Sequence, residues 1–402
     1  MRRALLPLVL GFAASLPLAA ADVRIEVGAG GADRDPGAIV RWVVPQGLVL
    51  PEPWRLVGDG GTEVPAQLET RPARAIVWAL DAKLPRWSKR RYRIETGAQS
   101  AKGGVECRDA DGKHLVLEVK GRPALRYNYG VIEPSPPVEP IFARSGYIHP
   151  LLTPAGLAVT GDSPMNHKHH HGVWMPWTKT TFEGRDVNFW EQGYGTGKVE
   201  CVGVGEKVSG PVFAGFRASH RFTDLKAPGG PKPVLEETWD VTVYSPETVF
   251  IIDFTSEQSA SSPSPLVLAE YRYGGFGFRG PLSWEGKDGM EFLTSEGRTR
   301  ADGHATRARW CAVSGKVDGK PCGVLFLCHP SNFRYPQPMR IHPDEPFFNF
   351  TPCQAGDFAI EPGKPYVSRY RMVVHDGKLE AAAAERFWKD YTEPPAVNVV
   401  RE

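Results

Sequence analysis

The densest group of chemically useful side chains is the histidine-rich segment Asn166–Gly172, which holds four of the eleven histidines in the chain. If the segment is extended, His167, His169 and His171 point one way and His170 the other. Three imidazoles on one face can hold a divalent metal with an open coordination position. Alternatively, one imidazole can act as a general acid or base near neutral pH. The structural alternative is a surface loop with incidental histidines.

Aromatic and acidic residues follow the histidines closely. Trp174 and Trp177 come next in the chain and can form an apolar wall or a platform for a sugar ring. The stretch 182–191 then mixes carboxylates with aromatics, and a β-hairpin would fold it back over the same pocket. Within it, Asp186 and Trp190 are predicted substrate contacts. A charged surface loop is the alternative interpretation.

Three other segments carry residue types that suit a binding site. Glu270 and Arg272 would share one face of a strand, just before a pair of glycines that permits close backbone approach. Arg144 is suited to an anionic or hydroxylated ligand. His329 and Asn332 follow the end of a strand, where polar residues often line the mouth of a sheet pocket. Structural ion pairs would explain the charged residues equally well.

The elements that must position these residues are predicted to be strands. Short apolar runs separated by turn residues predict a small β-sandwich domain over residues 22–100. Longer alternating runs predict large antiparallel sheets, packed face to face, over residues 105–393. One helix is predicted, from Leu379 to Tyr391. The fold class is therefore all-β with a C-terminal helix, and residues 394–402 are assigned to a tail.

The predicted strands have the bounds Val23–Val27, Ile39–Val44, Trp54–Val57, Val64–Leu68, Ala75–Leu80, Arg91–Glu95, His114–Val119, Glu237–Tyr244, Val249–Phe254, Cys322–Leu327 and Tyr366–Val374.

The N-terminus predicts export. Residues 1–21 are predicted to be a cleavable signal peptide, because two arginines are followed by an apolar run and a cleavage site of small residues. No cysteine stands at the cleavage point, so lipid attachment is not indicated, and the predicted location is secreted or periplasmic. An exported chain can form disulfides, and its six cysteines are either paired or buried free thiols. Cys322 and Cys328 end one strand and are too far apart to pair with each other.

Composition excludes several classes of partner. The formal net charge is +2, which argues against nucleic acid and anionic membranes because both need a concentrated basic field. After the signal peptide no apolar run is long enough for a membrane span. The sequence also lacks the nucleophile elbow, the HExxH zinc motif, the EF-hand loop and the Rossmann and P-loop signatures.

An ordered set of motifs resembles the PmoA-like family of exported proteins of undefined function. The motifs are Arg144–Leu151 (which contains His149), His169–Gly172, Asp186–Trp190, Gly274–Gly277 and His329–Asn332, and the resemblance spans about residues 105–392. The family name comes from a methane monooxygenase subunit, an integral membrane protein, and this chain lacks the helices for that function. The resemblance implies a galactose-mutarotase-like supersandwich, a fold used by sugar epimerases, glycoside hydrolases and polysaccharide lyases.

These observations together predict a carbohydrate-active protein that cleaves or isomerises a glycoside or polysaccharide fragment. His170 or His171 would be the acid/base group and Glu270 its partnering carboxylate. The predicted substrate contacts are Arg144, His149, Trp174, Asp186, Trp190, Arg272, His329 and Asn332. Two alternatives remain: a hydrolase or oxidoreductase with a divalent metal on His167, His169 and His171, and a carbohydrate-binding protein without catalysis.

Overall fold

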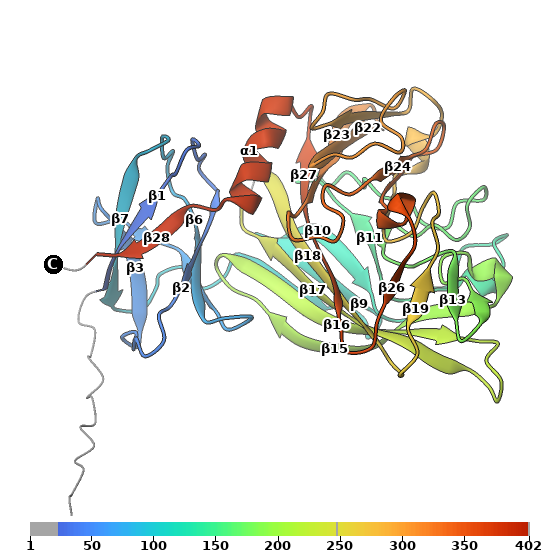
Figure 1. Ribbon diagram of the computed structural model, residues 1–402. Coiled ribbons are helices and arrows are strands. Elements are labelled where there is room, and N and C mark those ends of the chain that lie inside the picture. Colours follow the sequence, from blue (N-terminus) through green and yellow to red (C-terminus); the bar gives the residue numbers. More distant parts are fainter. Residues whose placement is uncertain (1–22, 247, 401–402) are drawn as a thin grey trace, which may run out of the picture.

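The computed structural model describes residues 23–246 and 248–400, and within them the chain is almost entirely β-structure with one α-helix (Figure 1). The predicted all-β class with a C-terminal helix is therefore confirmed. The predicted signal peptide lies outside the described residues. None of the helices in the described part is long and apolar enough to cross a membrane.

The small N-terminal unit consists of two sheets around one core. The first has the order β28-β1-β7-β3-β4 and the second the order β2-β6-β5. Their apolar faces enclose Trp42, Trp78 and Tyr92. The strands are β1 (Val23–Gly28), β2 (Ile39–Val43), β3 (Trp54–Gly58), β4 (Glu63–Val64), β5 (Ala66–Glu69), β6 (Ala75–Ala79), β7 (Lys89–Thr96) and β28 (Ala396–Val399).

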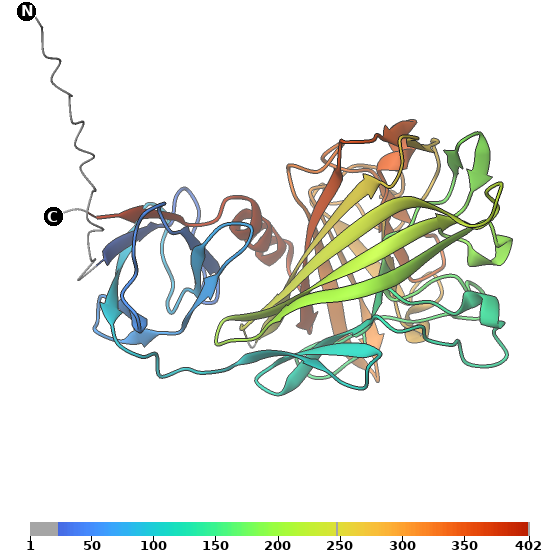
Figure 2. The same cartoon turned by 90° about the horizontal axis from the view of Figure 1, so that it is seen from below.

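Strand β28 comes from the segment 394–402 that the sequence assigned to a tail, and this assignment was wrong. Val397 and Val399 pair with Val27 and Ile25 of β1, so the C-terminal segment completes the N-terminal sheet. Figure 2 shows the chain leaving the small unit through one segment and returning to it through α1 and β28. The pairing was missed because four residues flanked by a proline pair carry little periodic signal.

The large unit contains two eight-stranded antiparallel sheets. The first has the order β24-β25-β20-β12-β11-β10-β9-β8 and the second β15-β16-β17-β18-β27-β23-β22-β21. The first sheet's strands are β8 (Val105–Asp109), β9 (His114–Val119), β10 (Arg122–Asn128), β11 (Tyr147–Leu151), β12 (Val173–Trp174), β20 (Phe276–Arg279), β24 (Met339–Ile341) and β25 (Phe347–Phe350). The second sheet's are β15 (Gly197–Val208), β16 (Phe213–Asp224), β17 (Lys232–Tyr244), β18 (Val249–Ala260), β21 (Met290–Thr294), β22 (Trp310–Val317), β23 (Lys320–Cys328) and β27 (Tyr366–Asp376).

Alternation along these strands builds the core between the two sheets. Leu115 and Leu117 of β9 face Trp239 and Val241 of β17 across one continuous apolar cluster. A third sheet has the order β14-β13-β19-β26 and lies at the end of the large unit that is away from the small unit (Figure 1). Its strands are β13 (Thr180–Phe182), β14 (Arg185–Val187), β19 (Leu266–Leu268) and β26 (Phe358–Ile360), and four short 3-10 helices are η1 (Pro140–Phe142), η2 (Gln192–Tyr194), η3 (Leu282–Trp284) and η4 (Pro352–Ala355).

Helix α1 (Ala381–Thr392) covers the outer face of the second sheet, close to the predicted bounds. Its buried Ala384 packs on Trp310, Leu325 and Val373. All six cysteines lie in the described part and none is paired there; four are buried and two are half-buried. Cys322 lies near the start of β23 and Cys328 at its end, so the two lie in one strand, as the sequence predicted.

The same alternation gives the first sheet a second, outward face. Val173, Phe278 and Phe348 point into the core, so their neighbours Trp174, Arg279 and Phe347 point out on the other side. Tyr147 and Trp190 join Trp174 and Phe347 there in a small separate cluster. The histidine-rich segment lies over this outward face.

Candidate functional site

The histidine segment is folded as two consecutive turns, not as a strand. The backbone N–H of His167 donates to the Pro164 carbonyl and that of His170 to the His167 carbonyl, both at 2.9 Å. Because turns do not alternate side chains, the prediction that His167, His169 and His171 share one face was wrong. His167, His169 and His170 line one cavity, and His171 lies elsewhere.

His171 is built into the scaffold. It is 1% exposed, and its Nδ1 and Nε2 lie 2.7 Å from Asp162 Oδ1 and 2.9 Å from Gln192 Oε1. The Gln192 amide is oriented by its own N–H, which donates to the Ala143 carbonyl. Both ring nitrogens are therefore occupied, and His171 is not available as the predicted acid/base group.

Gly172 explains how the chain turns from this buried histidine into β12. Its φ is +38°, and a Cβ there would overlap the carbonyl oxygen of Ile148. Only glycine can adopt this φ and also leave room for the Ile148 carbonyl oxygen. Within residues 23–246 and 248–400, no three His, Cys, Asp or Glu side chains are grouped to hold a metal ion, so the proposed triad of His167, His169 and His171 is not formed.

The cavity under the turns, which we call the histidine cavity, has a volume of about 180 Å³. It is lined by His167, His169, His170, Glu191, Arg272, Tyr273, Arg340, His342 and Phe347. Beneath it Arg279 donates to Glu345 Oε2 at 2.8 Å and to Glu285 Oε1 at 2.6 Å. The Asn166 amide donates to the same two carboxylates, which ties the histidine turns to this ion-paired base.

The histidines of this cavity are held in the neutral state. Burial lowers the pKa of His169 to about 4 and that of His342 to about 4, and it lowers the pKa of His170 well below its usual value. His342 Nδ1 accepts the backbone N–H groups of Asp344 and Glu345, at 3.2 and 2.9 Å. The proton of neutral His342 is therefore on Nε2, which makes this atom a donor.

The depressed histidine pKa values predict acid sensitivity. Unfolding restores a pKa of 6.5, so the unfolded chain binds protons first and stability falls as pH drops from about 6.5 to about 4. The double variant His169→Gln/His342→Gln is expected to lose stability less steeply in this window, measured as urea midpoint against pH. An unchanged slope would contradict the assignment. Part of the dependence of stability on pH should remain in the double variant, because other histidines also have lowered pKa values. They are His149, His167, His170, His304, His329 and His375.

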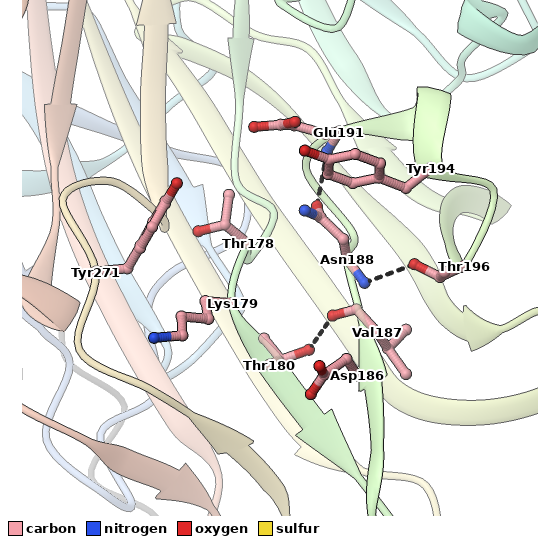
Figure 3. A pocket seen from close by; sticks show the side chains of 10 residues that line it. All are labelled: Thr178, Lys179, Thr180, Asp186, Val187, Asn188, Glu191, Tyr194, Thr196 and Tyr271. Atoms are coloured by element: carbon pink, nitrogen blue, oxygen red, sulfur yellow. Dashed lines mark hydrogen bonds between the residues drawn. The ribbon is translucent and has the colours of Figure 1, made fainter.

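A larger cavity of about 490 Å³ adjoins the first (Figure 3). It is lined by Thr178, Lys179, Thr180, Asp186, Val187, Asn188, Glu191, Tyr194, Thr196 and Tyr271. Glu191 lines both cavities, and the Tyr273 hydroxyl donates to its Oε1. Asn188 Oδ1 accepts the backbone N–H groups of Trp190 and Glu191, which fixes the loop that carries the carboxylate.

Some predicted contacts lie at these cavities and others do not. Arg272 lines the histidine cavity and Asp186 the larger one. Trp174 and Trp190 are fully buried behind His170, with their rings 4.8 Å apart, so they support the cavity wall and offer no face to a sugar. Glu270 is exposed and lines neither cavity; its backbone N–H donates to Asp357.

The remaining predicted contacts line neither cavity. Arg144 is buried away from both cavities, and burial lowers its pKa to about 10. The His149 carbonyl accepts from Arg126 and Asn128, and its ring bonds to Thr160. The buried Asn332 amide bridges the backbone N–H and carbonyl of Arg369.

His329 is likewise separate from the histidine cavity. Its ring bonds to Ser331 and packs on Tyr391 of α1. Sequence reasoning missed Glu191, Tyr273, Arg279, Arg340 and His342. Glu191 ends the mixed stretch 182–191 and was within reach of that argument, but isolated residues such as His342 and Arg340 carry no local signal.

Comparison with known proteins assigns the chain to a family. The model of the family of unknown function DUF6807 matches residues 114–389, and the chain belongs to that family. This description differs from the PmoA-like name that the motifs suggested, so that name is not supported. Among curated proteins nothing matches.

Solved structures are similar at low identity. The chain is 11% identical to a glycosyl hydrolase family 38 protein from Enterococcus faecalis, with a TM-score of 0.50, covering 96% of this chain and 48% of that one. An α-mannosidase from Enterococcus faecalis V583 is 10% identical with a TM-score of 0.48, covering 94% and 46%. A galactose mutarotase related enzyme from Lactobacillus acidophilus is 10% identical with a TM-score of 0.27, covering 68% and 100%. The chain therefore spans about half the length of the first two proteins, and the first likeness shows the fold alone.

Proposed function

We propose that this protein is an exported carbohydrate-active enzyme that cleaves or isomerises an oligosaccharide, with His169 and Glu191 as its acid–base pair. The observation that carries the proposal is the position of Glu191, which lines both cavities at their junction. A sugar chain lying through both cavities would present a bond or ring carbon to this carboxylate. Most glycoside hydrolases use two carboxyl groups beside the scissile bond, and here the imidazole of His169 would take the place of one of them.

The histidines complete the proposed chemistry. His169 has a pKa of about 4, so it is unprotonated at neutral pH and available to accept a proton. Glu191 contributes to the electrostatic environment of His169, which places the carboxyl group near the imidazole. In hydrolysis His169 would accept the proton of the attacking water, and Glu191 in its protonated form would donate a proton to the leaving oxygen. Transfer of the proton from His169 to Glu191 would then restore both groups, and the Tyr273 hydroxyl would hold Glu191 in position. These two residues replace His170 or His171 and Glu270, which the sequence favoured.

The test is conversion of a panel of neutral and acidic oligosaccharides by the purified protein, with products identified by mass spectrometry and by NMR of the anomeric carbon. We expect cleavage or isomerisation of at least one member. Saturable binding without any product would contradict the proposal and favour a carbohydrate-binding protein.

A further inference from the structure

Two arginines of the histidine cavity have no carboxylate partner. Arg272 and Arg340 both line the cavity, and neither makes an ion pair within residues 23–246 and 248–400. Arg340 Nη1 faces only His304 Nε2, at 3.3 Å, and its Nε is buried without a hydrogen-bond partner. Arg279 directly below differs, because it forms ion pairs with two carboxylates.

The arginines are close enough to repel each other. The charge of Arg272 adds to burial in lowering the pKa of Arg340. The Arg272 guanidinium is placed over the rings of Tyr271 and Tyr273, 5.9 and 5.6 Å from their centroids, which holds it at the cavity rim. Arg272 is exposed and Arg340 is half-buried, so water screens part of this repulsion, and an anion bound between the two guanidinium groups would relieve the rest.

The other lining groups do not supply that anion. Glu191 is the single carboxylate among the lining residues, so it can balance only one of the two arginines, and Tyr273 already donates to one of its oxygens. The histidines are neutral at neutral pH, so the lining has two positive charges and one negative one. A neutral imidazole such as His342, with its proton on Nε2, suits a sugar hydroxyl better than an anion.

We propose that the histidine cavity is a subsite for an acidic sugar residue, whose carboxylate or sulfate ester binds between Arg272 and Arg340 while the histidines contact its hydroxyls. This inference rests on the proposed function and narrows its substrate class. Guanidinium groups recognise carboxylate and sulfate through paired, charge-assisted hydrogen bonds. The cavity has room for one sugar ring, and the larger cavity would take the rest of the chain.

The test measures binding by calorimetry, independently of turnover. The probes are trisaccharides of galacturonate, glucuronate and mannuronate, their neutral methyl esters, and sulfated trisaccharides. We expect an acidic probe to bind about tenfold or more tightly than its neutral counterpart. Comparing the uronate trisaccharides with the sulfated ones shows whether the subsite recognises a carboxylate or a sulfate ester. Arg272→Gln/Arg340→Gln is expected to remove the preference, and Arg340→Lys to retain part of it.

Two controls separate recognition from folding. Arg217→Gln alters an exposed arginine on β16 and is expected to leave the preference unchanged. The double variant is expected to melt no lower than the wild type, because it removes unpaired charges. Equal binding of acidic and neutral probes, absence of acidic binding, or a preference that survives the double variant would overturn the subsite.

The two proposals fail differently. If the protein converted neutral oligosaccharides but did not bind acidic ones more tightly, the catalytic proposal would be supported and the acidic subsite would be overturned. Acidic binding that depends on the arginines, with no conversion of any probe, would support the subsite and overturn the catalytic proposal.

Discussion

Replacing Glu191 by glutamine is expected to lower turnover by about 10²–10⁴-fold on any oligosaccharide that the protein converts. Glutamine keeps the size of the side chain and an oxygen that can accept from Tyr273, so the change removes the ionisable group alone. Glu191 is half-buried and has no ion-pair partner among the described residues. The variant should therefore fold as the wild type does, with the loss in kcat.

Glu270→Gln is the matched comparison, because Glu270 is the carboxylate that the sequence favoured. It is exposed and lines neither cavity, so its turnover is expected to stay within about twofold of the wild type. Steady-state kinetics of both variants on the same substrate decide between the two residues. A large loss in Glu270→Gln with full activity in Glu191→Gln would reverse the assignment.

The contrast between Glu191 and Glu270 shows what local sequence patterns can predict and what they cannot. Alternation predicts which face of a strand is buried, and it located His114–Val119 and Tyr366–Val374 as strands β9 and β27. Pairing between distant strands is not visible in that pattern. Glu270 follows β19 of the small third sheet and is exposed, and it lines neither cavity although its neighbours Tyr271 and Tyr273 each line one.

The predicted arrangement of the histidine side chains was wrong for a related reason. Four histidines in five positions mark a candidate site, and three of them line the histidine cavity, but a turn and a strand of the same composition direct the side chains differently. The Pro164 and His167 carbonyls close the two turns, and His171 turns away to Asp162. The full cavity also needs His342 and Arg340, more than 160 residues along the chain, which only the pairing of β20, β25 and β24 brings near.

Arg279→Met is expected to cost about 3–5 kcal/mol of folding free energy, near the lower end of that range. Arg279 is 1% exposed and joins three segments: the histidine turns through Asn166, the η3 region through Glu285 and the β24–β25 connection through Glu345. Its removal leaves two carboxylates without a counter-ion. Their side chains are 31% and 17% exposed, so partial hydration limits the cost.

The control is Arg221→Met, which breaks an ion pair of 2.7 Å with Glu236 on the surface. Both of those side chains are more than 40% exposed, so the expected cost is below about 1 kcal/mol. Urea unfolding at pH 7 measures both variants. Arg279→Lys should fall between wild type and Arg279→Met, because it keeps the charge but loses the two-pronged geometry. Equal costs for Arg279→Met and Arg221→Met would mean that the base of the histidine cavity does not depend on Arg279, since its ion pairs would then contribute no more than exposed ones.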